Sequence, residues 1–399
     1  MKTQIKLLLI GLIVPMYLLS CSQSPVGIFA SIAREQRVVD ERELDNSLTV
    51  SDMAESSDRY FISAGLLYYR DIDYGASTLS QWQIIESPGS ADDNSTTNAV
   101  VSFEGSIFAT FTHQDGSPSG VYRVDPGANP PTVVGDQVFG TENPGTGNPG
   151  IESVGKLFVV DDGTDTWLLV SARTDTELLS YSLFASSDGT TFSEIPGTSA
   201  GTPWLGVADN NPGPELLYLS PAKAILDRDG IVGGDTVDIT AETGKAGSAA
   251  FTGSHFDTEN SILWLADDDG HLYSSSDFES SDSQSSWTRN TAAYRYENES
   301  DNEIIEFTDI TSVGTGAERI VVAGTRERGY YLLGANANAA PVSPGSSAAN
   351  YRESDLSDSA VNGFFVGSHS SGEYLFALSS SRGLWRGKVD SDPIVWIQE

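Results

Sequence analysis

The sequence predicts an all-β protein built from one repeated unit, and three observations support this prediction. Apolar runs of four to six residues alternate with Gly, Asp and Ser along almost the whole chain, which is typical of strands joined by tight turns. A stretch beginning at Ile320, IVVAGTRERGYYLL, recurs in recognisable copies. The aromatic or aliphatic position of this stretch returns at intervals near fifty residues. These features together favour a repeated sheet over a helical protein.

The copies share an apolar run, a short polar turn with Gly, an aliphatic residue and then an aromatic one. The clearer copies are YFISAGLLYYRD from Tyr60, IFATFTHQDGSPSGVYRVD from Ile107, ILWLADDDGHLYSSS from Ile262 and LFALSSSRGLWRG from Leu375. Looser copies begin at Leu178 and Leu217. In this pattern Tyr331 is predicted to pack between repeats, since it holds the aromatic position of the unit.

The marker positions of the repeat follow one another at steps of 54, 62, 42, 47, 58 and 54 residues. They are Tyr68, Tyr122, Phe184, Leu226, Tyr273, Tyr331 and Trp385. Several are followed across a polar turn by a second aromatic residue, which indicates hairpins. These residues are Trp82, Phe192, Trp287 and Trp396.

A period near fifty with four short strands per unit predicts a β-propeller. The markers predict seven blades over residues 59–399. Leu226 is the weakest marker, and without it the ring would have six blades and one long insertion.

The N-terminus has the layout of a signal peptide. Lys2 and Lys6 precede an apolar run from Leu7 to Leu19, which is too short for a membrane span. We therefore assign residues 1–20 to a signal peptide that takes no part in the fold.

The residues Leu18, Leu19, Ser20 and Cys21 resemble the bacterial lipobox. The resemblance implies cleavage before Cys21 and acylation of that cysteine, with palmitate among the expected acyl groups. It therefore implies a lipoprotein of the bacterial cell envelope, attached to the membrane through its N-terminal lipid. Ser22 rather than Asp follows the cysteine, which by resemblance to enterobacterial sorting favours the outer membrane.

Residues 21–58 are predicted to be an anchored N-terminal segment or linker. Gly27, Ile28 and Phe29 match part of the repeat, so this segment could donate a strand that closes the ring. The alternative is a tether with a transient helix from Ser31 to Leu44. Because Cys21 is the single cysteine, stability has to come from core burial rather than from a disulfide.

The composition is sufficient for a large hydrophobic core, and its acidic character argues against anionic partners. The chain is 39% hydrophobic and 10% aromatic, enough for one large domain. It carries 56 acidic and 22 basic residues, a formal charge of −34. We expect no binding of nucleic acid, because contacts with its phosphates need stripes of basic residues, which this sequence lacks. The same charge would be repelled by an anionic membrane surface, so attachment depends on lipid.

One hairpin resembles the Asp-box of BNR repeats, which occur in propellers. Its residues are Ser186, Asp188, Gly189, Thr191 and Phe192. The segment has one residue fewer before the aromatic position than the family pattern, and Phe replaces Trp. A looser match runs from Ser275 and Asp277 to Trp287, with a longer turn. The resemblance implies a structural role, in which the aspartate caps the turn and the aromatic residue packs between strands.

Sialidases are members of the same family, so the resemblance raises an enzyme as an alternative. Their Arg-Ile-Pro element does not occur in this sequence. The sequence does not allow an arginine triad to be assigned among Arg59, Arg70, Arg123, Arg173, Arg319 and Arg382. We therefore predict no catalytic residue, while a carbohydrate-active hydrolase or lyase at the axial channel is kept as the alternative.

Metal sites receive weak support from the sequence. The histidines His113, His255, His271 and His369 lie on separate repeats without metal-ligand spacing. Closely spaced acids make Asp227, Asp229, Asp267 and Asp269 candidate ligands of a structural calcium ion, although none follows the EF-hand order. Because Asp and Gly also serve turns, the turn interpretation is preferred and no other cofactor is expected.

The sequence therefore predicts a lipid-anchored envelope protein whose propeller is a binding or assembly module. The expected ligand is a protein or a glycan. A purely structural envelope protein is a further alternative.

Overall fold

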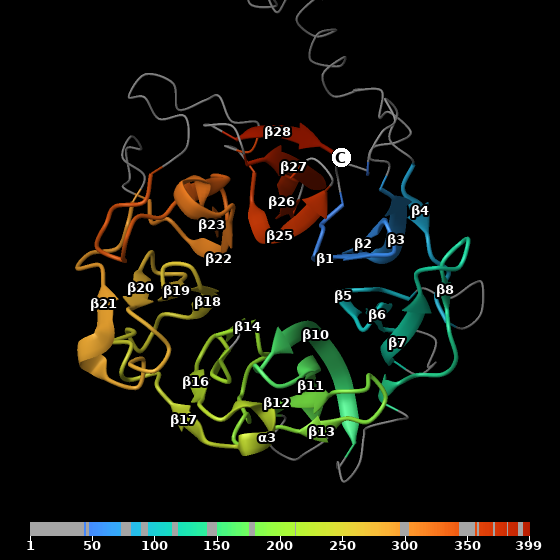
Figure 1. The fold of residues 1–399 in the computed structure, drawn as a ribbon, viewed down its shortest axis with the longest axis horizontal. Helices are drawn as coiled ribbons and strands as arrows, with labels where there is room; N and C mark the ends of the chain where they lie inside the picture. The colour runs from blue at the N-terminus through green and yellow to red at the C-terminus, as the bar shows by residue number, and fades with distance from the viewer. Residues whose placement is uncertain are drawn as a thin grey trace, which may run out of the picture. The chain divides into compact units, whose positions relative to one another are not determined.

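A computed structural model describes residues 44, 48–72, 81–88, 95–113, 119–141, 150–174, 180–211, 213–295, 303–342, 356, 359–369, 372–380, 382–389 and 394–399. Residues Leu44–Glu399 form one compact unit. This unit is an all-β, seven-bladed β-propeller (Figure 1).

Seven antiparallel sheets form the blades, each running in sequence order from the innermost strand outwards. Blade 1 consists of β1 (Asp52–Ser56), β2 (Arg59–Ala64), β3 (Leu66–Asp71) and β4 (Gln83–Ile84). Blade 2 consists of β5 (Val100–Phe103), β6 (Ser106–Phe111), β7 (Gly120–Asp125) and β8 (Thr132–Val133), with β9 (Phe139–Gly140) also paired to β7. Blade 3 consists of β10 (Ile151–Asp161), β11 (Thr166–Thr174), β12 (Tyr181–Ser186) and β13 (Ser193–Glu194).

Blade 4 consists of β14 (Gly206–Asp209), β15 (Leu216–Leu219), β16 (Ala224–Asp227) and β17 (Thr236–Asp238), with the short helix α3 (Gly230–Gly233) between its last two strands. Blade 5 consists of β18 (Phe251–Asp257), β19 (Ile262–Asp267), β20 (Leu272–Ser275) and β21 (Trp287–Arg289), and the 3₁₀ turn η1 (Gln284–Ser286) comes directly before β21. Blade 6 consists of β22 (Phe307–Val313), β23 (Ile320–Thr325) and β24 (Tyr330–Leu332), and the 3₁₀ turn η2 (Gly316–Glu318) connects the first two of them. Blade 7 consists of β25 (Val361–His369), β26 (Gly372–Ser379), β27 (Leu384–Lys388) and β28 (Val395–Gln398).

The sequence markers identify one strand in every blade. Tyr68, Tyr122, Phe184, Leu226, Tyr273, Tyr331 and Trp385 all lie on the third strand of successive blades. The second aromatic residues lie in the fourth strand or directly before it. The prediction of seven blades is therefore confirmed, and the weakest marker, Leu226, marks a blade of its own.

Buried apolar side chains form seven clusters, one between each pair of neighbouring blades. Alternation along a strand sends successive side chains to opposite faces of the sheet, so each blade contributes to two clusters. Tyr331 is 6% exposed and packs in the cluster between blades 5 and 6, with Trp264 and Phe307. This position agrees with its predicted role between repeats.

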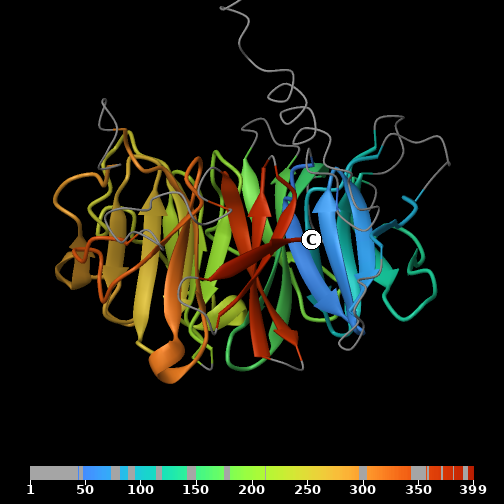
Figure 2. The same ribbon diagram turned by 90° about the horizontal axis from the view of Figure 1, so that it is seen from above.

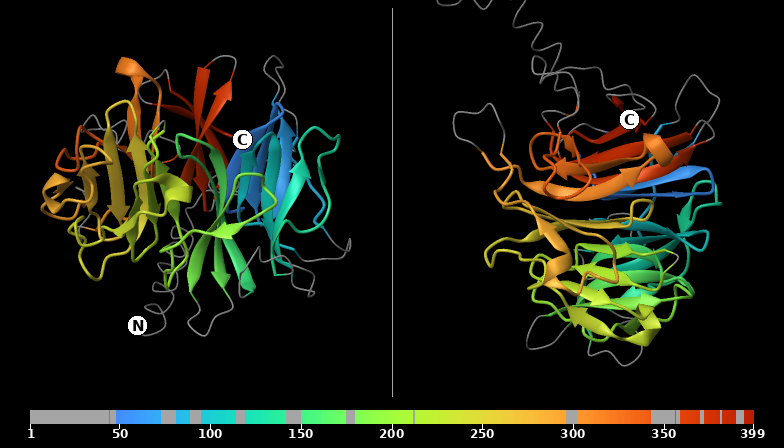
Figure 3. Two further views of the ribbon diagram at one scale, coloured as in Figure 1. Left: turned by 60° about the horizontal axis from the view of Figure 1, so that its bottom comes forward. Right: turned by 60° about the vertical axis from the view of Figure 1, so that its left-hand side comes forward.

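The ring closes between the first and last blades, which lie side by side (Figures 1 and 3). Leu44 and Val50 are buried in the cluster between these blades. The amide of Leu44 donates to the carbonyl of Glu399 at 3.1 Å, and that of Val50 donates to the carbonyl of Ser379 at 3.0 Å. Residues that precede the first strand therefore pack against the last blade.

The predicted boundary of the propeller at residue 59 is wrong. Strand β1, Asp52–Ser56, is the innermost strand of blade 1 and pairs with β2 through the register Asp52 to Ser63. Met53 and Ala54 alone give this strand too little apolar character for recognition from the sequence. The predicted closing strand at Gly27, Ile28 and Phe29 lies outside the described residues.

The innermost strands β1, β5, β10, β14, β18, β22 and β25 surround the axis of the ring, and neighbours among them are in contact. Seen side-on, the strands run between the two faces of the ring (Figure 2). This arrangement brings residues from distant parts of the sequence to one axial channel.

Candidate functional site

A cavity of about 300 Å³ lies in the axial channel. Its lining comes from the innermost strands of blades 7, 1, 2 and 3: Met53, Ala54, Glu55, Val101, Ser102, Val159, Phe365 and Val366. Most of this lining is apolar, and its polar groups are the carboxylate of Glu55 and the hydroxyl of Ser102. Concave, mainly apolar sites with few polar groups are typical ligand sites.

Two aspartates on innermost strands have equivalent roles in the channel. Asp52 Oδ2 accepts a hydrogen bond from the amide of Val100 at 3.1 Å. Asp309 Oδ2 accepts one from the amide of Phe364 at 2.9 Å. Each carboxylate thus caps an amide on the innermost strand of the next blade, which the sheet itself leaves unpaired.

Burial raises the pKa of both carboxyl groups. The pKa of Asp52 rises from 3.8 to about 7 and that of Asp309 to about 6, because a charge in the narrow channel is poorly solvated. Both side chains are half-buried, so water reaches them although protein surrounds them. The ammonium group of Lys156, on β10, favours ionisation of both. The carboxyl groups of Asp52 and Asp309, in blades 1 and 6, therefore ionise closer to neutral pH than an ordinary aspartate does.

A polar cluster bridges the innermost strands of blades 5 and 6. Arg319 Nε donates to Asp257 Oδ1 at 2.6 Å, and its Nη2 donates to Ser312 Oγ at 2.6 Å. His255 Nε2 lies 2.7 Å from the same hydroxyl. Burial lowers the pKa of His255 to about 4, with Arg319 adding to the shift and Asp257 opposing it, so this imidazole is neutral at pH 7. The contacts occupy the guanidinium and tie the two blades together.

The candidate calcium ligands bond within their own hairpins. Asp227 Oδ2 accepts from the hydroxyl of Tyr218 at 3.0 Å, and Asp267 Oδ2 accepts from that of Tyr273 at 2.6 Å. The amide of Asp269 donates to Asp267 Oδ1 at 3.0 Å, while Asp229 is exposed. Burial raises the pKa of Asp227 to about 6. In the part of the chain that is described, no three His, Cys, Asp or Glu side chains form a group that could hold a metal.

The hairpin between β12 and β13 contains the residues that resemble an Asp-box, Ser186 to Phe192. Asp188 Oδ1 accepts from the hydroxyl of Ser186 at 2.9 Å and from the amide of Thr191 at 2.7 Å. These bonds hold the pKa of Asp188 well below its usual range. Gly189 has φ of +68°, which favours glycine. Phe192 is buried against Phe139, with ring centroids 4.8 Å apart.

The looser second hairpin uses similar contacts over its longer turn. The amide of Ser280 donates to Asp277 Oδ1 at 2.6 Å, and Trp287 Nε1 donates to the carbonyl of Ser281 at 2.7 Å. Both hairpins are thus held by an aspartate in the turn. Their assignment to the BNR family remains a prediction.

The six arginines considered for a sialidase triad are spread over five blades, with Arg59 and Arg70 both in blade 1. Four form ion pairs with separate acids: Arg59 with Asp71, Arg70 with Glu399, Arg173 with Glu152 and Arg319 with Asp257. The other two, Arg123 and Arg382, are exposed. Among these six arginines, the structure brings no three together on a substrate position.

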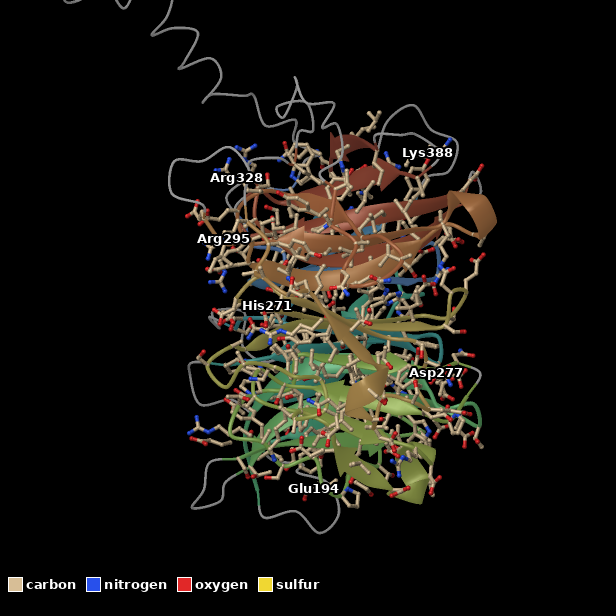
Figure 4. All side chains as sticks on the ribbon, turned by 90° about the vertical axis from the view of Figure 1, so that its left-hand side faces the viewer. Glu194, His271, Asp277, Arg295, Arg328 and Lys388 are labelled. Atoms are coloured by element: carbon tan, nitrogen blue, oxygen red, sulfur yellow. The ribbon has the colours of Figure 1, made fainter. Side chains whose placement is uncertain are left out.

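The four histidines are also dispersed. His113 is buried beside Phe111 and Tyr122, and its amide donates to Ser119 Oγ at 2.9 Å. His271 Nδ1 lies 3.4 Å from Asp267 Oδ2. His369 ends β25. Figure 4 shows His271 on the same side of the ring as Arg295 and Arg328.

Sequence reasoning missed Asp52, Asp309 and Lys156. Asp52 and Asp309 each precede an apolar residue on the first strand of a blade, as Asp-Met and Asp-Ile. An alignment of the first strands of the repeats would have matched these two positions. The markers instead came from the second and third strands, where aromatic residues are conspicuous.

Helices of the described residues include none with the length and apolar character needed to cross a membrane. Neither a known protein family nor a curated protein matches the chain in sequence.

Solved structures resemble the fold. The extracellular domain of a putative hybrid two-component system from B. thetaiotaomicron aligns with a TM-score of 0.52 at 13% identity, over 86% of this chain and 39% of that one. YCF48 bound to D1 peptide aligns with a TM-score of 0.53 at 12% identity, over 86% and 93% of the two chains. The WD40 propeller of Doa1 aligns with a TM-score of 0.50 at 12% identity, over 90% and 95%. At these identities the likeness establishes that the chain has the β-propeller fold.

Proposed function

We propose that this protein is a lipid-anchored component of the bacterial cell envelope whose propeller binds a segment of a partner protein at the axial channel. The observation that carries the proposal is the channel cavity, whose lining comes from the innermost strands of four blades. Its apolar walls suit apolar side chains of a peptide. Glu55 and Ser102 supply polar groups beside them.

A peptide is favoured as the ligand by the fold comparison. YCF48 has a structure with a bound peptide, and the chain covers 93% of it. The formal charge of −34 favours a segment that is neutral or basic over an acidic one, because like charges raise the free energy of association.

A channel variant tests binding. Val159→Arg places a bulky cation in the cavity and should remove a partner that co-purifies in a fixed ratio from native membranes. Val395→Arg is the matched control, since Val395 is 63% exposed on the outer strand β28. Equal recovery of the partner with both variants would contradict a channel site.

The lipid anchor is tested separately at Cys21. Labelled palmitate supplied to the producing cells should be incorporated into the wild-type protein and lost in Cys21→Ser, because the thiol is the predicted acylation site. The wild-type protein should fractionate with the outer membrane. Incorporation that survives the substitution would exclude the proposed anchor.

A further inference from the structure

A second cavity, of about 340 Å³, lies on the perimeter between blades 3 and 4. The hairpin of β12 and β13 forms one side, and α3 of blade 4 forms the other, as their neighbouring positions in Figure 1 show. Figure 4 places Glu194, one of the lining residues, at the outer edge of the ring. The cavity is therefore separate from the axial channel.

The apolar part of this cavity is held in place before any ligand arrives. Trp167 lines it, and the indole Nε1 donates to Asp162 Oδ2 at 2.9 Å. Asp162 is itself fixed, because its Oδ1 accepts from the amide of Asp165 at 2.9 Å. Ile231 and Val232 add aliphatic surface to the same lining, and Val232 is 79% exposed although it is apolar. Such an exposed apolar side chain beside a fixed indole is a ready contact for an apolar ring face.

The polar part of the cavity consists of hydroxyls and carboxylates. Ser193 and Glu194 of β13 and Asp188 of the hairpin turn line it, and none of its lining residues is basic. Asp188 is ionised at neutral pH, because the turn hydrogen bonds hold its pKa below the usual range. Two carboxylates repel an anionic ligand and accept hydrogen bonds from hydroxyl groups. The hydroxyl of Ser193 can also donate a hydrogen bond, and a simple alkylammonium ion has no acceptor atom to receive it.

We propose that this perimeter cavity binds a neutral hexose ring. The apolar C–H face of the sugar contacts Trp167 and Val232, and its hydroxyls donate to Asp188 and Glu194. The volume is sufficient for one sugar ring, at the lower end of the range for small-molecule sites. The site would give the propeller a contact with glycans that is independent of its channel.

Saturation-transfer NMR on the full chain tests this site with methyl glycosides of glucose, galactose, mannose and N-acetylglucosamine. At least one neutral glycoside should show transfer to its ring protons. Methyl glucuronide and tetramethylammonium should bind at least about tenfold more weakly, a difference of about 1.4 kcal/mol.

Two variants locate the signal. Val232→Glu should weaken binding at least about tenfold by placing a charge on the apolar wall. Val395→Glu changes a comparably exposed valine of blade 7 and should leave binding unchanged. Both substitutions are at exposed positions, and equal melting temperatures verify the fold.

Three results would overturn the proposal: no transfer to any of the four neutral glycosides, transfer of equal strength in Val232→Glu, or stronger binding of the glucuronide or the ammonium ion. Loss of channel binding in Val159→Arg would leave the sugar signal intact, so the two sites are tested independently.

Discussion

At the scale of single residues, the channel carboxylates Asp52 and Asp309 combine a structural role with unfavourable ionisation. Each caps an amide of the neighbouring blade, and this contact favours the charged form. Burial outweighs the contact and raises both pKa values. Their ionisation is therefore a cost to the folded state at neutral pH, as is common where a site is kept for binding.

The stability of the fold should depend on the ionisation of Asp309. Its pKa is raised to about 6 in the folded protein, so the folded state binds the proton more tightly than the unfolded chain does. The contribution of Asp309 to the free energy of unfolding should therefore fall as pH rises from about 4 to 7, and it should stay constant at higher pH. Asp309→Asn keeps an acceptor for the amide of Phe364 and should raise stability at pH 8 by on the order of 1 to 3 kcal/mol.

Urea unfolding at pH 4.5 and pH 8 measures this effect. The gain of Asp309→Asn over the wild type should be larger at pH 8. Glu104→Gln, at an exposed turn, is the control and should show no such difference. A gain that is equal at the two pH values would show that ionisation of Asp309 does not oppose folding.

At the scale of strands and blades, the aromatic position of the third strand organises the packing. Tyr331 fills the space between blades 5 and 6 with Trp264 and Phe307. Tyr331→Ala should therefore lower the free energy of unfolding by about 3 to 5 kcal/mol, through lost burial and a cavity.

The matched control for Tyr331 is Val342→Ala in the same blade, because Val342 is largely exposed. This change should stay within about 0.5 kcal/mol of wild type by urea unfolding. If Tyr331→Ala unfolded like the control, its place in the inter-blade core would be refuted.

The markers could be predicted from the sequence because they repeat a local pattern. An apolar run, a turn and an aromatic residue recur in each blade, so Tyr331 and even Leu226 identified their strands. The channel carboxylates share an Asp-apolar pair on the first strands of only two blades, which is too little to distinguish them among 56 acidic residues without the strand positions. Strand β1 was missed because only Met53 and Ala54 are apolar in it.

At the scale of the propeller, an ion-pair triad around the buried side chain of Glu399 joins the first and last blades. Arg70 Nη2 lies 2.6 Å from Glu399 Oε2, and Arg386 Nε lies 2.6 Å from Oε1. Arg70 also stacks on Trp82, and Arg386 stacks on Tyr374. No local sequence pattern could reveal this contact, because Arg70 and Glu399 are 329 residues apart.

Removal of the shared carboxylate should open the ring at this joint. Glu399→Gln leaves two arginines without their anion in a buried setting and should cost about 3 to 5 kcal/mol in urea unfolding. Arg326→Ala, which breaks an exposed pair with Glu306, should cost less than about 1 kcal/mol. Similar costs for the two variants would mean that the triad does not secure the closure.

We expect this protein to meet its partner at the axial channel. A photo-crosslinking residue at Val159, in the channel, can be compared with one at Val395, on the perimeter, in the native cells. We expect a discrete crosslinked product from position 159 that is absent from position 395. The absence of a product at position 159, or the same product at both positions, would contradict the claim.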